Sequence, residues 1–334
     1  MALTLPDRYP LAALPTPLTR SIRLERVLDS PPILVKRDDL TGFALAGNKA
    51  RKLEFLLGDA LAGGCDVLVT GGGPGSNHCQ ATAAAAHVAG LSCHLVMYGT
   101  EPARSHPNLA LARRLGATVS FTAQADRASV DPALAEVAEG LAAAGHRPYV
   151  IPRGGATAVG AAGYGLAVAE LAGQLTSLGL EPEIVVVAAG SCGTQAGLLA
   201  GVTAHSLPWR VLGATVSRPP TECRERVLRL ARECGALLGG PLAEAGRVEV
   251  RDARGPGYGT ASMAGTQAAC LAASAEGLLL DPVYTAKAFG ELLSLIRAGL
   301  QGPAVFVHTG GTPAAVLDLI IARDARKGAC DAGT

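Results

Sequence analysis

The sequence predicts an α/β protein in which helices cover both faces of parallel sheets. Strand-sized apolar runs alternate with segments of helical periodicity along nearly the whole chain. Several of these runs end in glycine-rich turns, as strands do where a ligand binds at the edge of a parallel sheet. With 334 residues, 49% of them hydrophobic, the chain is long enough for two domains or one large α/β unit.

Strand and helix patterns follow one another closely in the first half of the chain. Residues 1–32 contain several prolines and are expected to wrap over the surface. A short strand is expected at 33–37, and a helix is expected from Lys49 with Asn48 as its N-cap. Asp131, followed by proline, is expected to cap a later helix. The other expected strands are 66–70, 93–98, 117–121 and 148–151, and the other expected helices are about 78–90, 109–115 and 131–144.

The second half continues the same alternation. Three turns come directly after predicted strands. Because ligands bind beyond the carboxyl ends of strands in such sheets, the turns are expected to form the site. These turns are 71–77, 189–195 and 309–312. The expected helices are about 158–178, 195–204 and one from about Tyr284, and the expected strands are 184–188, 211–216 and 304–308.

Composition and charge exclude several classes of function. Charged residues make up 17% of the chain and give a net charge of +1, without a basic block that would bind nucleic acid. The apolar runs are too short to span a membrane, and no signal peptide is expected. The eight cysteines lack CxxC spacing, which favours free thiols in a reducing cytoplasm. The seven histidines form no HxxxH or HExxH pair, so no metal site is expected.

The stretch around Lys49 gives the first indication of chemistry. Lys49 is expected in the first turn of its helix, where free backbone amides disfavour a cation. An amine held neutral as an imine with an aldehyde cofactor removes this conflict, and Lys52 is placed to meet a phosphate. Two surface lysines, tolerated at small cost, would explain the same residues.

The turn at 189–194 has two interpretations. Its small residues, its free amides and the hydroxyls of Ser191 and Thr194 suit a phosphate, although an ordinary tight turn would look similar. The turn also approaches the nucleophile elbow of a serine hydrolase, and Ser191, Asp281 and His308 occur in the chain order of such a triad. An alanine in place of the first elbow glycine and the lack of an HGGG-like segment count against a hydrolase.

A second loop, at 73–77, suits a carboxylate. The first-turn amides of the following helix and the Ser76 hydroxyl can hold such a group, and Asn77 can donate to an anionic oxygen of an aromatic cofactor. A plain helix N-cap at Ser76 or Asn77 is the alternative. His78 is expected to be an uncharged histidine on the helix surface.

Eight segments in a fixed order and spacing match one family: Pro15–Leu18, Lys36–Asp39, Gly47–Glu54, Ser76–His78, Gly190–Thr194, Gly257–Gly259, Asp281–Tyr284 and His308–Gly311. Through them the chain resembles the D-cysteine desulfhydrase and 1-aminocyclopropane-1-carboxylate deaminase group of fold-type II pyridoxal-phosphate enzymes. The resemblance covers nearly the whole chain. It implies two open, twisted, mostly parallel sheets flanked by helices, as in the tryptophan synthase β subunit. It also implies a homodimer and a small amino-acid substrate, with a large domain at 1–46 and 155–334 and a small inserted domain at 47–154.

Carried over by position, the resemblance implies a role for each candidate residue. Lys49 would form the imine with pyridoxal 5′-phosphate and, once displaced by the substrate amine, would act as a base beside the Cα proton. A β leaving group would then depart and leave pyruvate and ammonia, with Tyr284 as a proton donor or acceptor. The implied cofactor-binding residues are Lys49, Lys52, Asn77, Ser191, Cys192, Gly193, Thr194 and Thr285. The implied catalytic residues are Lys49, Ser76, Tyr258 and Tyr284, and the implied substrate-binding residues are Ser76, Asn77, His78, Tyr258 and Tyr284. Packing with a solvated hydroxyl is the alternative for both tyrosines.

Thr285 decides between the two activities of the group. As the family pattern implies, the deaminases have Glu at this position against the pyridine nitrogen, and the desulfhydrases have Thr. A hydroxyl offers a neutral hydrogen bond, about half as strong as a charged one, which suits substrates with good leaving groups better than the opening of a cyclopropane ring. A β-eliminating lyase is therefore expected, although helix-capping would also explain the threonine.

Two departures from the family pattern leave the substrate open. Ala46 replaces the usual first glycine before Asn48, and would cost about 1–2 kcal/mol if that residue is left-handed. Residues 73–75 replace a bulkier segment, which is expected to widen or loosen the carboxylate loop. Ring opening, a larger substrate or β-replacement therefore remain alternatives, as does a non-catalytic amino-acid-binding protein.

Overall fold

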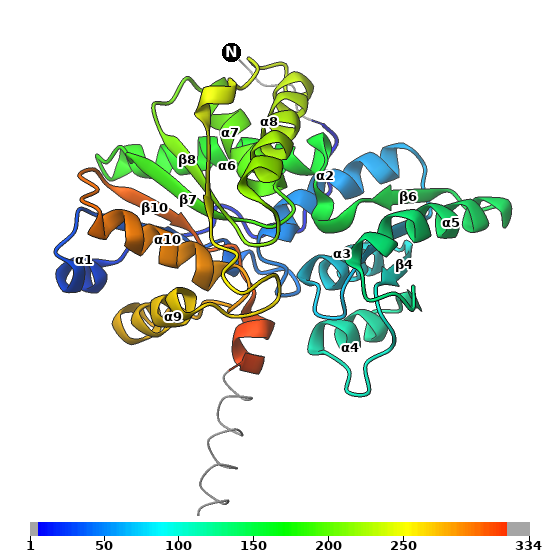
Figure 1. Cartoon of the computed structure of the whole chain (residues 1–334). Helices are drawn as coiled ribbons and strands as arrows, with labels where there is room; N and C mark the ends of the chain where they lie inside the picture. The colour runs from blue at the N-terminus through cyan, green and yellow to red at the C-terminus, as the bar shows by residue number, and fades with distance from the viewer. Residues whose placement is uncertain (1–5, 319–334) are drawn as a thin grey trace, which may run out of the picture.

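The computed structural model describes residues 6–318 and contains two sheets with helices on both faces (Figure 1). In the larger sheet β1 pairs antiparallel with β2, and the remaining pairs are parallel. The smaller sheet is parallel. In spatial order, the larger sheet has β1 (Leu18–Arg20), β2 (Ile33–Lys36), β10 (Ala304–Val307), β7 (Ile184–Ala189), β8 (Arg210–Thr215) and β9 (Val248–Asp252). The smaller has β5 (Thr118–Phe121), β4 (Ser92–Met97), β3 (Val67–Gly72) and β6 (Pro148–Ile151).

Ten labelled helices accompany these sheets in the described part of the chain. They are α1 (Ile22–Leu28), α2 (Asn48–Ala62), α3 (Asn77–Val88), α4 (Pro107–Arg114), α5 (Val130–Ala143), α6 (Ala158–Ser177), α7 (Gly193–Ala204), α8 (Pro220–Leu237), α9 (Met263–Glu276) and α10 (Thr285–Arg297).

The larger sheet lies between two layers of helices, and the buried side chains of its strands alternate between the two faces. Ile184 and Val186 of β7 pack towards α9 and α10, whereas Val185 and Val187 pack towards α6 and α7. Successive side chains of a strand point to opposite faces, so a continuous apolar run supplies both layers. Figure 1 shows α9 and α10 on one side of this sheet and α6 to α8 on the other. The smaller sheet likewise packs against α2, α3 and α4 on one face and against α5 on the other.

Residues 312–318, at the end of the described range, are also helical. Short 3₁₀ turns are η1 (Asp38–Leu40), η2 (Arg127–Ser129), η3 (Arg153–Gly155) and η4 (Ala245–Arg247). Among residues 6–318, no helix is both long and apolar enough to cross a bilayer.

The predicted parallel α/β architecture is confirmed, and each expected strand and helix is present with small shifts at its ends. The elements that the sequence did not predict are β1, α1, α8, β9 and α9. Two predicted caps are wrong. Gly47, with φ of 55°, is the N-cap of α2, and Asn48 is the first helical residue. Ser129 precedes α5, and Asp131 lies within its first turn, paired with Arg153.

A buried polar network holds α2, the helix on which Lys49 lies, against the larger sheet. Arg51 of α2 is 3% exposed at its side chain and donates to both carboxylate oxygens of Asp38, at 2.9 Å each. Its guanidinium also donates to Glu170 of α6, which pairs with Lys36 of β2. Tyr164 donates a further hydrogen bond to Asp38. Because each buried charge has several partners, this face of α2 is fixed in register against β2 and α6.

Asp38→Asn tests this anchor. The substitution leaves the Arg51 guanidinium buried without its main carboxylate, so we expect the free energy of unfolding to fall by about 3 kcal/mol. The matched control is Glu233→Gln, which removes the exposed partner of Arg229 and is expected to cost less than about 0.5 kcal/mol. Guanidinium-chloride unfolding of the apoprotein measures both. Equal unfolding midpoints for the two variants would contradict the anchoring role.

Candidate active site

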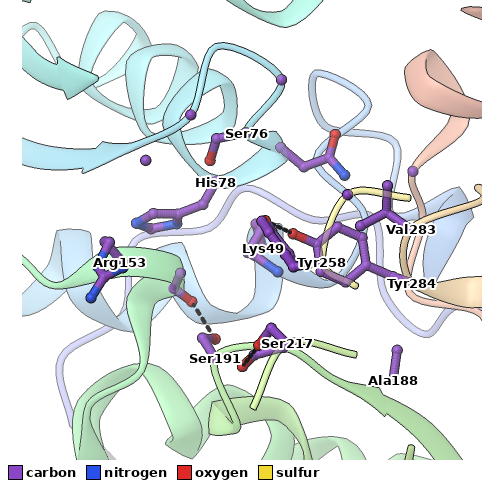
Figure 2. Close-up of a pocket in the computed structure, with 18 of the residues that line it drawn as sticks. Lys49, Ser76, His78, Arg153, Ala188, Ser191, Ser217, Tyr258, Val283 and Tyr284 are labelled. Atoms are coloured by element: carbon purple, nitrogen blue, oxygen red, sulfur yellow. Dashed lines mark hydrogen bonds between the residues drawn. The ribbon is translucent and has the colours of Figure 1, made fainter. Parts of the chain in front are cut away.

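A cavity of about 290 Å³ lies where loops from the two sheets meet (Figure 2). It is lined by the segments that follow β3, β7, β8 and β10, each at the carboxyl end of its strand. The three turns predicted from the sequence all contribute, at Gly73, Ser191 and Thr309 among others. The three turns therefore line one cavity, and their role as a binding site stays a prediction. Figure 2 shows Lys49 between Ser76 on one side and Ser191 and Ser217 on the other.

The Lys49 amine lies in this cavity without a directly paired carboxylate in the described chain. Its Nζ donates to the Asn48 side-chain oxygen at 2.8 Å. Burial lowers the pKa of Lys49 from 10.5 to about 8, and the negative charge of Asp281 opposes this shift. A substantial fraction of the amine is therefore neutral near physiological pH, the form that attacks a carbonyl. The conflict between a cation and the first turn of α2 is resolved by partial deprotonation.

Asn48 connects this lysine to the turn before α7. Its side-chain nitrogen donates to Thr194 Oγ1 at 2.9 Å, while its oxygen accepts from Lys49. Sequence reasoning assigned Asn48 to helix capping and missed this connection. The position of Asn48 between Gly47 and Lys49 was the available signal, but the preference of asparagine for helix N-caps favoured the capping interpretation.

Lys52 lies one turn further along α2, fully buried beside the turn before α7. Its Nζ donates to the Gly154 carbonyl at 3.3 Å, and no carboxylate within residues 6–318 pairs with it. Burial, followed by the nearby positive charge of Lys49, holds the pKa of Lys52 well below its usual value. At Gly193 a Cβ would lie 2.9 Å from Lys52 Nζ and 3.2 Å from the Ala156 Cα, so a side chain here would displace the lysine amine. Cys192 precedes it with φ of 74°, which turns successive amides into a concave N-terminus of α7.

The loop before α3 is tighter than the sequence suggested. Ser76 is the N-cap of α3 and accepts from the Cys79 amide at 3.2 Å, so the capping interpretation is correct for this residue. The Asn77 oxygen accepts from the Asn108 side chain at 2.8 Å. A widened loop at 73–75 was expected, but Tyr98 and His106 fill the space beside its glycines. Residue 46 is not left-handed either, because the positive φ angles lie at residues 44 and 45 instead.

The predicted position of His78 on the helix surface is wrong. Its side chain is buried in the cavity wall, with Nε2 3.0 Å from Thr70 Oγ1. Burial, followed by the positive charges of Lys49 and Lys52, holds the pKa of His78 well below 6.5. The imidazole is therefore neutral, and its Nδ1 has no hydrogen-bond partner in the described chain. Because α3 is rich in alanine, its sequence shows no distinct apolar face from which the burial of His78 could be predicted.

Tyr258 and Tyr284 form one hydroxyl pair at the edge of the cavity. Their hydroxyl oxygens are 2.5 Å apart and their rings are packed edge to face. Desolvation of the hydroxyls raises the pKa of both, most strongly for Tyr284. Each therefore retains its proton at neutral pH and can donate it, rather than accept one, in the resting site.

The Thr285 hydroxyl is directed to Asp281. It donates to Asp281 Oδ1 at 2.7 Å and accepts from the Asp281 amide at 2.7 Å. Asp281 lines the cavity, whereas Thr285 is fully buried. The same carboxylate accepts from the amides of residues 283 to 285, which fix the start of α10, while burial raises its pKa. The role of Thr285 at a ring nitrogen stays a prediction.

The serine-hydrolase triad is not assembled. Ser191 Oγ donates to the Gly154 carbonyl at 3.4 Å, and His308 Nε2 lies 3.1 Å from the Leu279 carbonyl. Asp281 bonds to its own helix start rather than to His308. Ser191 and His308 therefore do not form a nucleophile–base pair, and residues 6–318 contain no cluster of metal-binding side chains.

Comparison with known proteins agrees with this geometry. Residues 10–310 match the family model described as "Pyridoxal-phosphate dependent enzyme". The chain belongs to this family. It is 42% identical to a putative 1-aminocyclopropane-1-carboxylate deaminase of Pyrococcus abyssi, with 89% of each chain covered. It is 41% identical to a D-cysteine desulfhydrase of Salmonella paratyphi A, with 93% of this chain and 96% of that one covered. A solved ACC deaminase homologue superposes with a TM-score of 0.86 at 37% identity, covering 92% and 93% of the two chains.

The residues of the cavity fit the cofactor of this family. A phosphate dianion would balance the charge of the buried Lys52 amine. The left-handed backbone at Cys192 and the lack of a side chain at Gly193 suit such a group. The low pKa of Lys49 suits an amine that reacts with an aldehyde. The family and its cofactor are therefore consistent with what the residues themselves require.

Residues from η2, η3 and the segment after β8 were missed as site residues. Arg127, Arg153, Ser217 and Arg218 all line the cavity. Ser217 and Arg218 follow the predicted strand 211–216, so their position after a parallel strand could have identified them. Arg127 lies on a surface turn far away in the sequence, and no local pattern distinguishes it.

The pH dependence of amine labelling tests the electrostatics of the site. In the apoprotein we expect half-maximal acetylation of Lys49 near pH 8, because burial favours its neutral form. Asp281→Asn removes the charge that opposes this shift, so the midpoint should fall further. Peptide mass spectrometry after brief acetic anhydride pulses measures both. A Lys49 midpoint near 10.5 would show that the amine is not desolvated.

Proposed function

We propose that this chain is a pyridoxal-phosphate-dependent lyase of the D-cysteine desulfhydrase type. It would eliminate the β-substituent of a small amino acid and give pyruvate, ammonia and the leaving group. The observation that carries the proposal is a pair of lysines, one helical turn apart, without carboxylate partners in the described chain. Lys49 lines the cavity with a lowered pKa, and Lys52 is fully buried beside Gly193 at the start of α7. We also propose a homodimer in the cytoplasm, with a large domain at 1–46 and 155–334 and a small domain at 47–154.

Each wall of the cavity has a proposed task. Lys49 carries the cofactor covalently, and Lys52 with the 191–194 turn holds its phosphate. Asn77 meets an anionic oxygen of the cofactor ring. The amides at the start of α3, with Ser76, hold the substrate carboxylate, and His78 supports this wall as a neutral group.

Proton movement is assigned to three residues. Once the substrate amine has replaced it, the neutral Lys49 amine takes the Cα proton, which its low pKa permits. When bound, the cofactor ring accepts the electron pair released at Cα. Tyr284, supported by Tyr258, donates a proton towards the leaving group, since desolvation keeps both hydroxyls protonated. Water is restricted by the enclosing loops from both sheets.

Thr285 favours elimination over ring opening. Its hydroxyl proton is directed to Asp281, so Thr285 offers a ring nitrogen no charged hydrogen bond. 1-Aminocyclopropane-1-carboxylate deamination is the second candidate, because a relative at 42% identity has that name. β-Replacement is a third outcome of the same site, if a nucleophile enters before the product leaves.

A visible spectrum of the purified enzyme tests the proposal. We expect an absorption band that borohydride abolishes and that Lys49→Ala lacks, together with pyruvate formation from D-cysteine. Lys52→Ala is the matched control: it should retain the band at high cofactor concentration but bind the cofactor about 10-fold to 100-fold more weakly, because a charged hydrogen bond to phosphate is lost. An unchanged band in Lys49→Ala would disprove the assignment.

A substrate comparison tests the choice between the two activities. We expect kcat/KM for D-cysteine or β-chloroalanine to exceed that for 1-aminocyclopropane-1-carboxylate by at least about 100-fold, since the site lacks a carboxylate directly at position 285. Keto-acid release measures each rate. Comparable rates would mean that Thr285 does not limit the electron sink.

A further inference from the structure

Arg127 places an unneutralised guanidinium at the cavity. It lies in η2, beside the smaller sheet, and lines the cavity with Cζ 5.2 Å from the centre of the Tyr258 ring. One of its nitrogens, Nη2, donates to the Ser217 carbonyl at 2.8 Å. Within residues 6–318 it has no carboxylate partner, and its other N–H groups have no hydrogen-bond acceptor. A guanidinium held on an aromatic face with free donors is a preorganised oxyanion site.

The other cations of the cavity are already matched. Arg153 pairs with Asp131 through two hydrogen bonds, and Arg218 lies 2.9 Å from Glu222 while donating to the Gly190 carbonyl. In the proposed function, Lys49 and Lys52 are used by the cofactor aldehyde and phosphate. The substrate α-carboxylate is held at the start of α3. Of the cations that line the cavity within residues 6–318, Arg127 is then the one left for another negative group.

The position of Arg127 identifies that group as part of the substituent on Cβ. Its guanidinium rests on Tyr258, whose hydroxyl bonds to Tyr284, the proposed donor to the leaving group. Figure 2 shows Ser76, the proposed carboxylate ligand, and Tyr284 on different sides of Lys49. A substrate with its α-carboxylate at Ser76 would therefore direct its β-substituent towards the tyrosine pair, on which Arg127 rests.

We infer that Arg127 makes the enzyme selective for amino acids whose β-substituent ends in a tetrahedral oxyanion, a sulfonate or a phosphate ester. This inference rests on the proposed elimination. Lys49 removes the Cα proton, and the bond to the substituent breaks with its electron pair leaving on the substituent. A C–S bond releases sulfite and a C–O bond releases phosphate, so each group gains one negative charge. Every leaving group gains this charge, but only a sulfonate or a phosphate ester already carries anionic oxygens that the planar guanidinium can bind before the bond breaks.

Binding of an unreactive probe tests the inference without turnover. 3-Sulfopropanoate carries a carboxylate and a sulfonate but no amine, and propanoate lacks the sulfonate. Measured by calorimetry on the holoenzyme, Arg127→Gln should weaken the binding of 3-sulfopropanoate by about 10-fold to 100-fold, which corresponds to the loss of one charged hydrogen bond. The binding of propanoate should be unchanged. The matched control is Arg229→Gln. Arg229 is exposed on α8 and paired with Glu233, so this variant removes the same charge elsewhere and should change the binding of neither ligand.

Kinetics distinguish the two oxyanions and separate this inference from the proposed function. We expect kcat/KM for cysteate or O-phosphoserine to exceed that for β-chloroalanine in the wild type and to lose this advantage in Arg127→Gln. Whichever of cysteate and O-phosphoserine shows the larger loss is the preferred class. Turnover of β-chloroalanine alone, with no loss of 3-sulfopropanoate binding in Arg127→Gln, would overturn the inference and leave the lyase intact. Failure of every substrate would contradict the proposed function, and the calorimetry would still decide on Arg127.

A structural role or a role in cofactor binding gives a different pattern. Equal weakening of 3-sulfopropanoate and propanoate would show that Arg127 only holds the cavity together through Ser217 and Tyr258. A tenfold loss of pyridoxal 5′-phosphate affinity in Arg127→Gln, measured by gel filtration and absorbance, would assign the guanidinium to the cofactor phosphate. Either result overturns the inference.

Discussion

The constraint on which the structure depends is the burial of two lysine amines, one helical turn apart, in the first turns of α2. Neither has a carboxylate partner in the described chain. Burial lowers the pKa of both amines, and the positive charge of Lys49 lowers the pKa of Lys52 further. An isolated buried ammonium is strongly unfavourable, so the protein must either neutralise these groups or provide anions for them. An aldehyde that consumes one amine and a phosphate that pairs with the other satisfy both requirements at once.

The surrounding fold keeps this unfavourable arrangement in place. Arg51, between the two lysines, points to the opposite side of α2 into the network of Asp38, Glu170 and Lys36. One helix thus carries well-paired charges on one face and unpaired amines on the other. Because the paired face fixes the register of α2, the amines cannot escape to solvent by a small shift. Cavity loops from both sheets then enclose the reactive face.

Much of the fold followed from local patterns in the sequence, and the exceptions have physical causes. Continuous apolar strands such as 184–189 and the glycine-rich turns after them are distinctive, because they must be buried on both faces and must approach a ligand. The short β1 and the polar β9 are edge strands that depend on their neighbours, and α9 is rich in alanine, so none shows a clear period. Within the site, the structure brings Lys49 and Lys52 of α2 close to the turn that contains Ser191, as we expected from the sequence. The burial of His78, the bridge made by Asn48 and the approach of Arg127 depend on contacts between distant segments, and no local pattern contains them.

The central claim is tested most directly by locating the covalent bond between the cofactor and the chain. Holoenzyme is reduced with borohydride, digested and mapped by tandem mass spectrometry. The account predicts a phosphopyridoxyl group on Lys49 and on no other lysine. A modified Lys52, or an unmodified Lys49 in fully loaded enzyme, would contradict it.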